Sequence, residues 1–121
     1  MSDDLRSQLV QRHCAHGAPA LDAAGVQALL AAVPCWHVDA APDMGERLVR
    51  EFAFLDYMET IAFANALAWM VHREDHHPLL SVDYKRCTAS WTTHSAGNRL
   101  SENDFICAAR ADAIYAGRTG A

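Results

Sequence analysis

The stretch LLSVDYKRCTASW, Leu79 to Trp91, decides the fold, because its apolar residues change parity halfway along. They occupy even positions in the first half and odd positions in the second: Leu80, Val82 and Tyr84, then Cys87, Ala89 and Trp91. Side chains alternate between the faces of a strand, so a two-residue turn at Lys85-Arg86 would bring both sets to one face. The expected pairs are Tyr84 with Cys87, Val82 with Ala89 and Leu80 with Trp91. The stretch therefore predicts a β-hairpin with one apolar face.

The same register bears on the histidines that flank the hairpin. Extended outward, it would place His94 opposite His77 on the polar face. Pro78 cannot donate to a strand ladder, and Lys-Arg is not a favoured hairpin turn, so a bulge could shift the register. The pattern nevertheless brings a distant histidine toward the adjacent pair His76-His77.

Helices are expected on both sides of this hairpin. Asp56 begins a capping-box pattern with a glutamate three residues on, and a helix should follow to about Arg73. Apolar side chains cover nearly all directions around this helix, which predicts burial on more than one side and hence self-association. A second capping box, Ser101-x-x-Asp104, opens a helix expected to end near Tyr115.

The first half of the chain adds one helix and two strands. Asp22 can cap a helix that runs to about Val33, where Pro34 ends it. Strands are expected at 36–39 and 47–54, because turn residues separate these two stretches.

The element order is therefore αββαββα, which predicts an α+β fold with an antiparallel sheet covered by helices on one face. Residues 1–20 are expected to form a loosely ordered arm. Residues 21–117 are expected to form a single domain.

Composition narrows the functional classes. The chain of 121 residues is 51% apolar and has a net charge of −5, and its ten basic residues are scattered, which argues against a nucleic-acid surface. The start MSDDLRSQLV lacks the basic and apolar regions of a secretory signal, and the most apolar run, 61–71, is about half the length of a bilayer span. Four widely spaced cysteines favour reduced thiols. We therefore expect a cytoplasmic protein without nucleic-acid or membrane partners.

The candidate functional residues are His76, His77 and His94, and Asp104 is a candidate supporting residue. Imidazole titrates near neutral pH, so converging rings can supply both a proton donor and a proton acceptor without a metal. On these residues alone, a second interpretation of His76-His77 is favourable contact with the negative end of the preceding helix. Asp104 is equally explained as a helix cap.

Metal binding is the other alternative. Three histidines can hold a catalytic zinc ion, although adjacent ligands are awkward for one metal and no H-E-x-x-H motif is present. A further candidate metal cluster is His13, Cys14 and His16, in the expected arm.

Taken together, the motifs resemble those of the pterin-4a-carbinolamine dehydratases, over roughly Leu21 to Tyr115. A double His-Pro followed by Thr-His and Ser-x-x-Asp is a specific combination. The residues that carry the resemblance are Trp36, LVREFAFLDYMETIAFANALA, His76-His77-Pro78, Tyr84, Thr93-His94 and LSENDF with Asp104.

The resemblance implies a four-stranded antiparallel sheet with three helices packed on one face, assembled into homodimers or homotetramers. It implies a hydro-lyase that converts 4a-hydroxytetrahydropterin to quinonoid dihydropterin, without metal or cofactor, and so recycles the pterin of aromatic amino-acid hydroxylases. The residues it implies are His76, His77 and His94 as catalytic, Asp104 as supporting, and Pro78, Ser81 and Thr93 as substrate-binding.

Two departures from the family pattern concern the edge of the site. His72 stands where the family as a rule has an acidic residue, and the loop AGNR makes the segment between His94 and Asp104 one residue longer than usual. Animal members also act as dimerisation cofactors of a transcription factor. The alternative function is therefore a non-catalytic pterin-binding or protein-interaction module, although a scaffold has no physical need for three imidazoles at one pocket.

Overall fold

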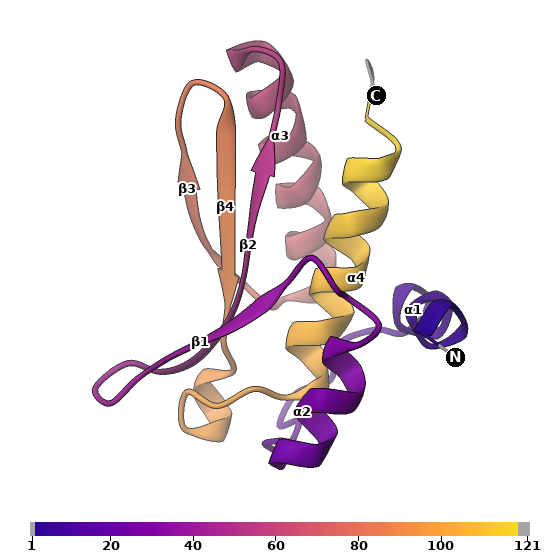
Figure 1. Cartoon of the computed structure of the whole chain (residues 1–121), viewed down its shortest axis with the longest axis vertical. Coiled ribbons are helices and arrows are strands. Elements are labelled where there is room, and N and C mark those ends of the chain that lie inside the picture. The colour runs from indigo at the N-terminus through magenta and orange to yellow at the C-terminus, as the bar shows by residue number, and fades with distance from the viewer. Residues whose placement is uncertain (1, 119–121) are drawn as a thin grey trace.

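The computed structural model describes residues 2–118, which form one antiparallel sheet with helices on one face (Figure 1). The strand order is β1-β2-β4-β3. The strands are β1 (His37–Ala41), β2 (Gly45–Ala53), β3 (Leu79–Val82) and β4 (Arg86–Trp91). The helices are α1 (Ser2–Gln11), α2 (Ala23–Leu30), α3 (Tyr57–Glu74) and α4 (Glu102–Ala116), with a short 3-10 helix, η1 (His94–Ala96).

The predicted α+β fold, with its four-stranded antiparallel sheet, is confirmed. Most predicted boundaries lie within two residues of the observed ones, but α2 ends at Leu30, three residues before Val33. All three predicted N-caps are present: Asp22 accepts from the Gly25 N–H, Asp56 accepts from the Glu59 N–H, and Ser101 forms a capping box with Asp104. The box expected at Asp56 is altered, because the Glu59 side chain accepts from the Leu55 N–H. None of the helices in residues 2–118 is long and apolar enough to cross a membrane.

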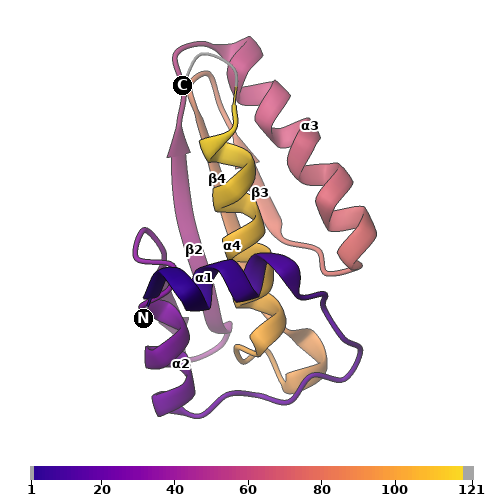
Figure 2. The same ribbon diagram turned by 90° about the vertical axis from the view of Figure 1, so that its right-hand side faces the viewer.

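The N-terminal segment differs from the expected loosely ordered arm, because residues 2–11 form a fourth helix. Figure 2 shows α1 crossing α4 on the side away from the sheet. Leu9 is fully buried, and Leu5 and Val10 pack against the core. The 4–5-residue spacing of these apolar side chains gives α1 one apolar stripe, which binds it to α4.

The hairpin has the predicted face but a different register. Leu80 pairs with Ala89 and Val82 with Cys87, so the register is shifted by two residues and the parity is kept. The turn lies at Tyr84-Lys85, because the Asp83 carboxylate accepts from the Lys85 and Arg86 N–H groups at 3.2 and 3.0 Å. Tyr84 is therefore at the tip of the hairpin and 65% exposed, not on the apolar face.

The core lies between the sheet and the helices, and α4 contacts each of α1, α2, α3 and β2. Its largest fully buried side chains come from both layers: Trp91 and Phe52 from the strands, Phe105 and Leu67 from the helices. A row of large apolar side chains on α3 is left exposed, including Met58, Ile61 and Trp69. The prediction that α3 is apolar all round therefore holds, and one of its faces is uncovered in the single chain.

Replacing Gly45 by alanine is expected to destabilise the fold by about 2–4 kcal/mol. Gly45 has a φ of 75°, and an added Cβ would collide with the Asn98 backbone oxygen and lie 2.7 Å from the Asn98 Cβ. Gly97 is a matched control, because its φ is 74° but a Cβ there meets no atom within 4 Å. Urea unfolding of both variants measures the difference, and equal losses would show that the close approach to Asn98 contributes nothing.

Candidate active site

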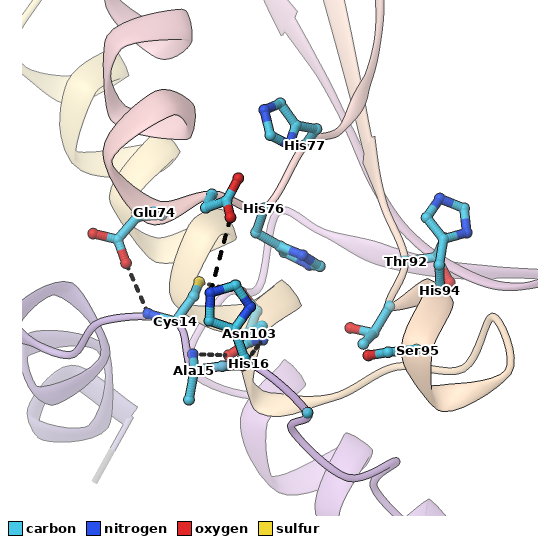
Figure 3. A pocket seen from close by; sticks show the side chains of 13 residues that line it. Cys14, Ala15, His16, Glu74, His76, His77, Thr92, His94, Ser95 and Asn103 are labelled. Carbon is cyan, nitrogen blue, oxygen red and sulfur yellow. Dashed lines mark hydrogen bonds and ion pairs between the residues drawn. The ribbon is translucent and has the colours of Figure 1, made fainter.

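A pocket of about 320 Å³ lies where the end of α3, the end of β4 and the N-terminal segment meet (Figure 3). The structure brings the three predicted histidines to this pocket: His76, His77 and His94 all line it. The lining is made by residues 14–17, 74–77, 92–95 and 103. We take this pocket as the candidate active site.

The end of α3 explains how two adjacent histidines border one pocket. Asp75 follows the helix in the left-handed conformation, with a φ of 53°, and turns the chain before Pro78. A side chain of the sheet holds the backbone of this turn, because the indole N–H of Trp91 donates a hydrogen bond to the His76 carbonyl at 2.9 Å. Neighbouring side chains are therefore freed from the opposite-face geometry that a helix or strand would impose.

His76 forms a buried dyad with Asp104. Its Nε2 lies 2.6 Å from Oδ1 of Asp104, whose side chain is fully buried. The other carboxylate oxygen accepts from the Ser101 N–H at 2.9 Å and from the Thr93 hydroxyl at 2.8 Å. An ionised carboxylate only accepts, so Nε2 of His76 is the donor in this contact, and in the neutral ring Nδ1 then carries a lone pair.

His94 reaches the pocket from η1 and not through a continuation of the hairpin. β4 ends at Trp91, and Thr93 forms an isolated bridge with Arg99, so the suggested pairing of His94 with His77 does not occur. The Nδ1 of His94 lies 2.7 Å from the side-chain oxygen of Asn98. An amide oxygen only accepts, so Nδ1 carries the proton and Nε2 is left free. The longer loop noted in the sequence contains Asn98, the residue that holds this ring.

Of the three residues predicted to bind substrate, one lines the pocket and two do not. Thr93 lines the pocket, but its hydroxyl is occupied by Asp104 and by Ser101 Oγ at 2.7 Å. Pro78 and Ser81 do not line the pocket, and Ser81 lies on the edge strand β3 opposite Thr88.

Sequence reasoning missed Thr92 as a pocket residue, although Thr92 has the parity of His94 and so belongs to the polar face of the predicted hairpin. Thr92 lines the pocket, and its buried hydroxyl has no hydrogen-bond partner within the described chain. Burying a hydroxyl without a hydrogen-bond partner lowers the stability of the fold. Such groups are typical of sites where a ligand or a water molecule supplies the partner. The parity of the strand was the signal that could have indicated it.

The N-terminal cluster proposed for metal binding is used otherwise. His13 Nδ1 lies 2.8 Å from the Glu74 carboxylate, and the Cys14 sulfur lies 3.6 Å from that of Cys107. Within residues 2–118, no three His, Cys, Asp or Glu side chains are grouped as metal ligands. None of the four cysteines forms a disulfide in the structure of residues 2–118, and burial raises the pKa of Cys87 to about 11.

Glu74, at the end of α3, binds the N-terminal segment through His13 and Cys14, and these contacts shift the pKa of its carboxyl. Burial raises the pKa of the Glu74 carboxyl, but hydrogen bonds from the Cys14 N–H and His13, with the charge of Arg110, outweigh burial and lower the pKa below its ordinary value of 4.5. A pKa lowered in the folded state means that the ionised form stabilises the fold above about pH 4.5. That stabilisation is lost as the pH falls through the folded-state pKa.

Replacing Glu74 by glutamine is therefore expected to lower the free energy of unfolding at pH 7 by about 1–3 kcal/mol. The difference from the unsubstituted protein should shrink as the pH falls through the folded-state pKa of Glu74, which lies below 4.5, because both side chains are neutral once that carboxyl is protonated. Glu102→Gln is the control, because its exposed pair with Arg12 contributes about 0–1 kcal/mol. Urea unfolding between pH 3 and 8 gives the measurement, and a pH-independent difference would contradict the assigned charge.

Comparisons with known proteins agree with this architecture. The family model described as pterin 4 alpha carbinolamine dehydratase matches residues 19–114. A protein of Nitrosospira multiformis is 40% identical over 93% of this chain and 94% of its own length. One of Xanthomonas oryzae pv. oryzae is 53% identical over 72% of this chain and 70% of its own length. Both carry the provisional name pterin-4-alpha-carbinolamine dehydratase.

Two solved structures share the fold. A transcriptional coactivator/pterin dehydratase from Brucella melitensis matches with a TM-score of 0.69 and 27% identity, over 78% of this chain and 97% of that one. A pterin dehydratase-like protein identified as a RuBisCO assembly factor in the alpha-carboxysome matches with a TM-score of 0.57 and 28% identity, over 69% and 92%. On the family match and the identities, the chain belongs to the pterin 4 alpha carbinolamine dehydratase family.

Proposed function

We propose that the protein dehydrates 4a-hydroxytetrahydropterin to quinonoid dihydropterin by histidine acid/base catalysis, and thereby recycles the pterin cofactor of aromatic amino-acid hydroxylases. The observation that carries the proposal is the His76–Asp104 dyad, at 2.6 Å, in the same pocket as His77 and His94. A buried carboxylate that orients an imidazole is a recurring arrangement for proton transfer.

The reaction needs two proton transfers. The hydroxyl on C4a is a poor leaving group and departs as water only when it receives a proton, while a ring nitrogen of the pterin loses its own. We assign His76 and His94 as the acid/base pair, since Asp104 and Asn98 each hold one ring nitrogen and leave the other for the substrate. His77, exposed at the pocket, is assigned to binding and polarising the pterin. Each such transfer is typically worth about a hundredfold to ten-thousandfold in rate.

The test is the rate of quinonoid dihydropterin formation from freshly generated 4a-hydroxytetrahydropterin, with and without the purified protein, in the presence of a metal chelator. Acceleration that survives the chelator supports the metal-free reaction. A rate equal to the spontaneous one contradicts the dehydratase. Acceleration that the chelator abolishes would instead indicate that the histidines bind a catalytic metal such as zinc.

An interaction role is the second candidate, and the apolar face of α3 favours it. Met58 and Trp69 are 74% and 62% exposed, and a cavity of about 600 Å³ lies between the start of α3 and the end of α4. Exposed apolar surface of this kind marks a protein interface. We propose that this face joins copies of the chain into a homodimer or homotetramer, with or without catalysis.

Trp69→Lys is expected to shift the protein toward the monomer and to weaken association at least about tenfold, because buried indoles dominate interface energies. Met44→Lys is the control, since Met44 is 49% exposed on the turn between β1 and β2. Light scattering after size exclusion measures the mass of each. An unchanged mass for Trp69→Lys would place the interface elsewhere.

A further inference from the structure

A segment outside the residues matched by the family model forms one wall of the pocket. This segment, Arg12–Gly17, is called the strap below, and residues 14–17 line the pocket. In Figure 3 the strap borders the pocket on one side, and His94 and Ser95 border it on the other.

Glu74 holds the strap against the end of α3. The Cys14 N–H donates to one oxygen of the Glu74 carboxylate at 2.7 Å, and His13 Nδ1 lies 2.8 Å from the other. The Glu74 side chain is only 3% exposed. Burying a carboxylate is costly unless it is well paired, so these bonds fix the strap firmly next to His76.

Asn103 and Arg110 hold the strap against α4. The Asn103 side chain pairs with the Ala15 backbone in both directions, accepting from its N–H at 3.0 Å and donating to its carbonyl at 2.8 Å. Arg110 donates to the Arg12 carbonyl. Asn103 is itself buried. The buried side chains of Glu74 and Asn103, together with Arg110, therefore determine the path of the strap up to Ala15.

The next residue, His16, is free where the strap reaches the pocket. Its side chain is 95% exposed, and the closest charged group to it is the Asp75 carboxylate, at 3.9 Å. Gly17 then adopts a φ of 73°, which turns the chain away. The hydrogen bonds that hold the strap reach Ala15, the residue before His16, and the only polar contact of the His16 ring within residues 2–118 is the one with Asp75.

We propose that His16 is a substrate-binding residue, and that the strap positions its imidazole against the pterin bound in the pocket. This inference rests on the proposed function. A pterin carries hydrogen-bond donors and acceptors around its fused ring, and an imidazole can serve either kind. The ring adds affinity without taking part in proton transfer, because the proposed mechanism already assigns both transfers to the unpaired ring nitrogens of His76 and His94.

His16→Ala is expected to raise the Kd for 7,8-dihydrobiopterin, used as a stable probe, by about threefold to tenfold, as one lost hydrogen bond implies. The KM for 4a-hydroxytetrahydropterin should rise by the same factor, with kcat within about twofold of the unsubstituted value. Asn103→Ala should act in the same direction and also speed amide hydrogen exchange at Ala15, because it releases the strap.

His37→Ala is the matched control, since His37 is an exposed imidazole on β1 outside the pocket. Unchanged Kd and KM in His16→Ala, with an active unsubstituted protein, would overturn this inference alone and leave the strap as an anchor for α1. A fall in kcat without a rise in KM would also overturn it. An unsubstituted protein that neither binds the probe nor turns over would overturn the dehydratase proposal and this inference with it.

Discussion

Replacement of His94 by alanine is expected to lower kcat by about a hundredfold to ten-thousandfold and to leave the melting temperature nearly unchanged. The ring is exposed, and its hydrogen bond in the described structure joins Nδ1 to Asn98 at 2.7 Å, so its loss removes little from the fold. If Nε2 moves a proton to or from the substrate, no other described side chain takes its position. Steady-state turnover and thermal unfolding of the same preparation separate the two effects.

His37→Ala again provides the control, because it removes an exposed imidazole that does not line the pocket. It should change neither turnover nor stability. Turnover retained in His94→Ala would favour the interaction module over the enzyme. A melting temperature that falls with kcat would instead mean that η1 needs the His94–Asn98 contact for its structure.

The apolar pattern of Leu79–Trp91 predicted the face of the hairpin but not its register. Parity survives a shift of two residues, so alternation alone cannot distinguish the expected pairing from Leu80 with Ala89. The carboxylate of Asp83 decides between them, because it binds the two N–H groups that follow the turn. A side-chain contact of this kind leaves no periodic signal in the sequence.

The candidate site was predictable for its histidines and not for its walls. Residue types and order indicated His76, His77 and His94, and the structure brings them to one pocket. The strap was predicted to be part of a loosely ordered arm, because the hydrogen bonds by which Glu74 and Asn103 hold it join residues that are 60 and 88 positions apart in the chain. Such contacts depend on the packing of α3 and α4, which the sequence pattern does not specify.

Asp104 joins the two interpretations that the sequence left open. One carboxylate oxygen caps α4 through the Ser101 N–H, and the other holds the His76 ring. A carboxylate has lone pairs on both oxygens, so capping and ring orientation do not compete. The start of α4 therefore fixes the position of the His76 ring. A substitution that disturbs the cap should also change the orientation of this ring.

Asp104→Asn is accordingly expected to lower kcat by about a hundredfold to ten-thousandfold and to reduce the free energy of unfolding by about 1–3 kcal/mol. The amide oxygen can replace one carboxylate oxygen toward Ser101 and Thr93, but its NH₂ group then faces His76 Nε2. Nε2 must accept, so the ring proton moves to Nδ1 and the lone pair offered to the pocket is lost. Nitrogen NMR of the His76 ring reports this exchange of tautomers directly.

Asp56→Asn is the matched control for the capping part of the loss. Asp56 caps α3 by accepting from the Glu59 N–H at 2.8 Å, and it lies outside the pocket. Asparagine is also a good N-cap residue, so this variant should lose little stability and no turnover. If Asp104→Asn loses stability but keeps both its turnover and its His76 tautomer, the carboxylate is only a cap. The dyad is then a by-product of where α4 begins.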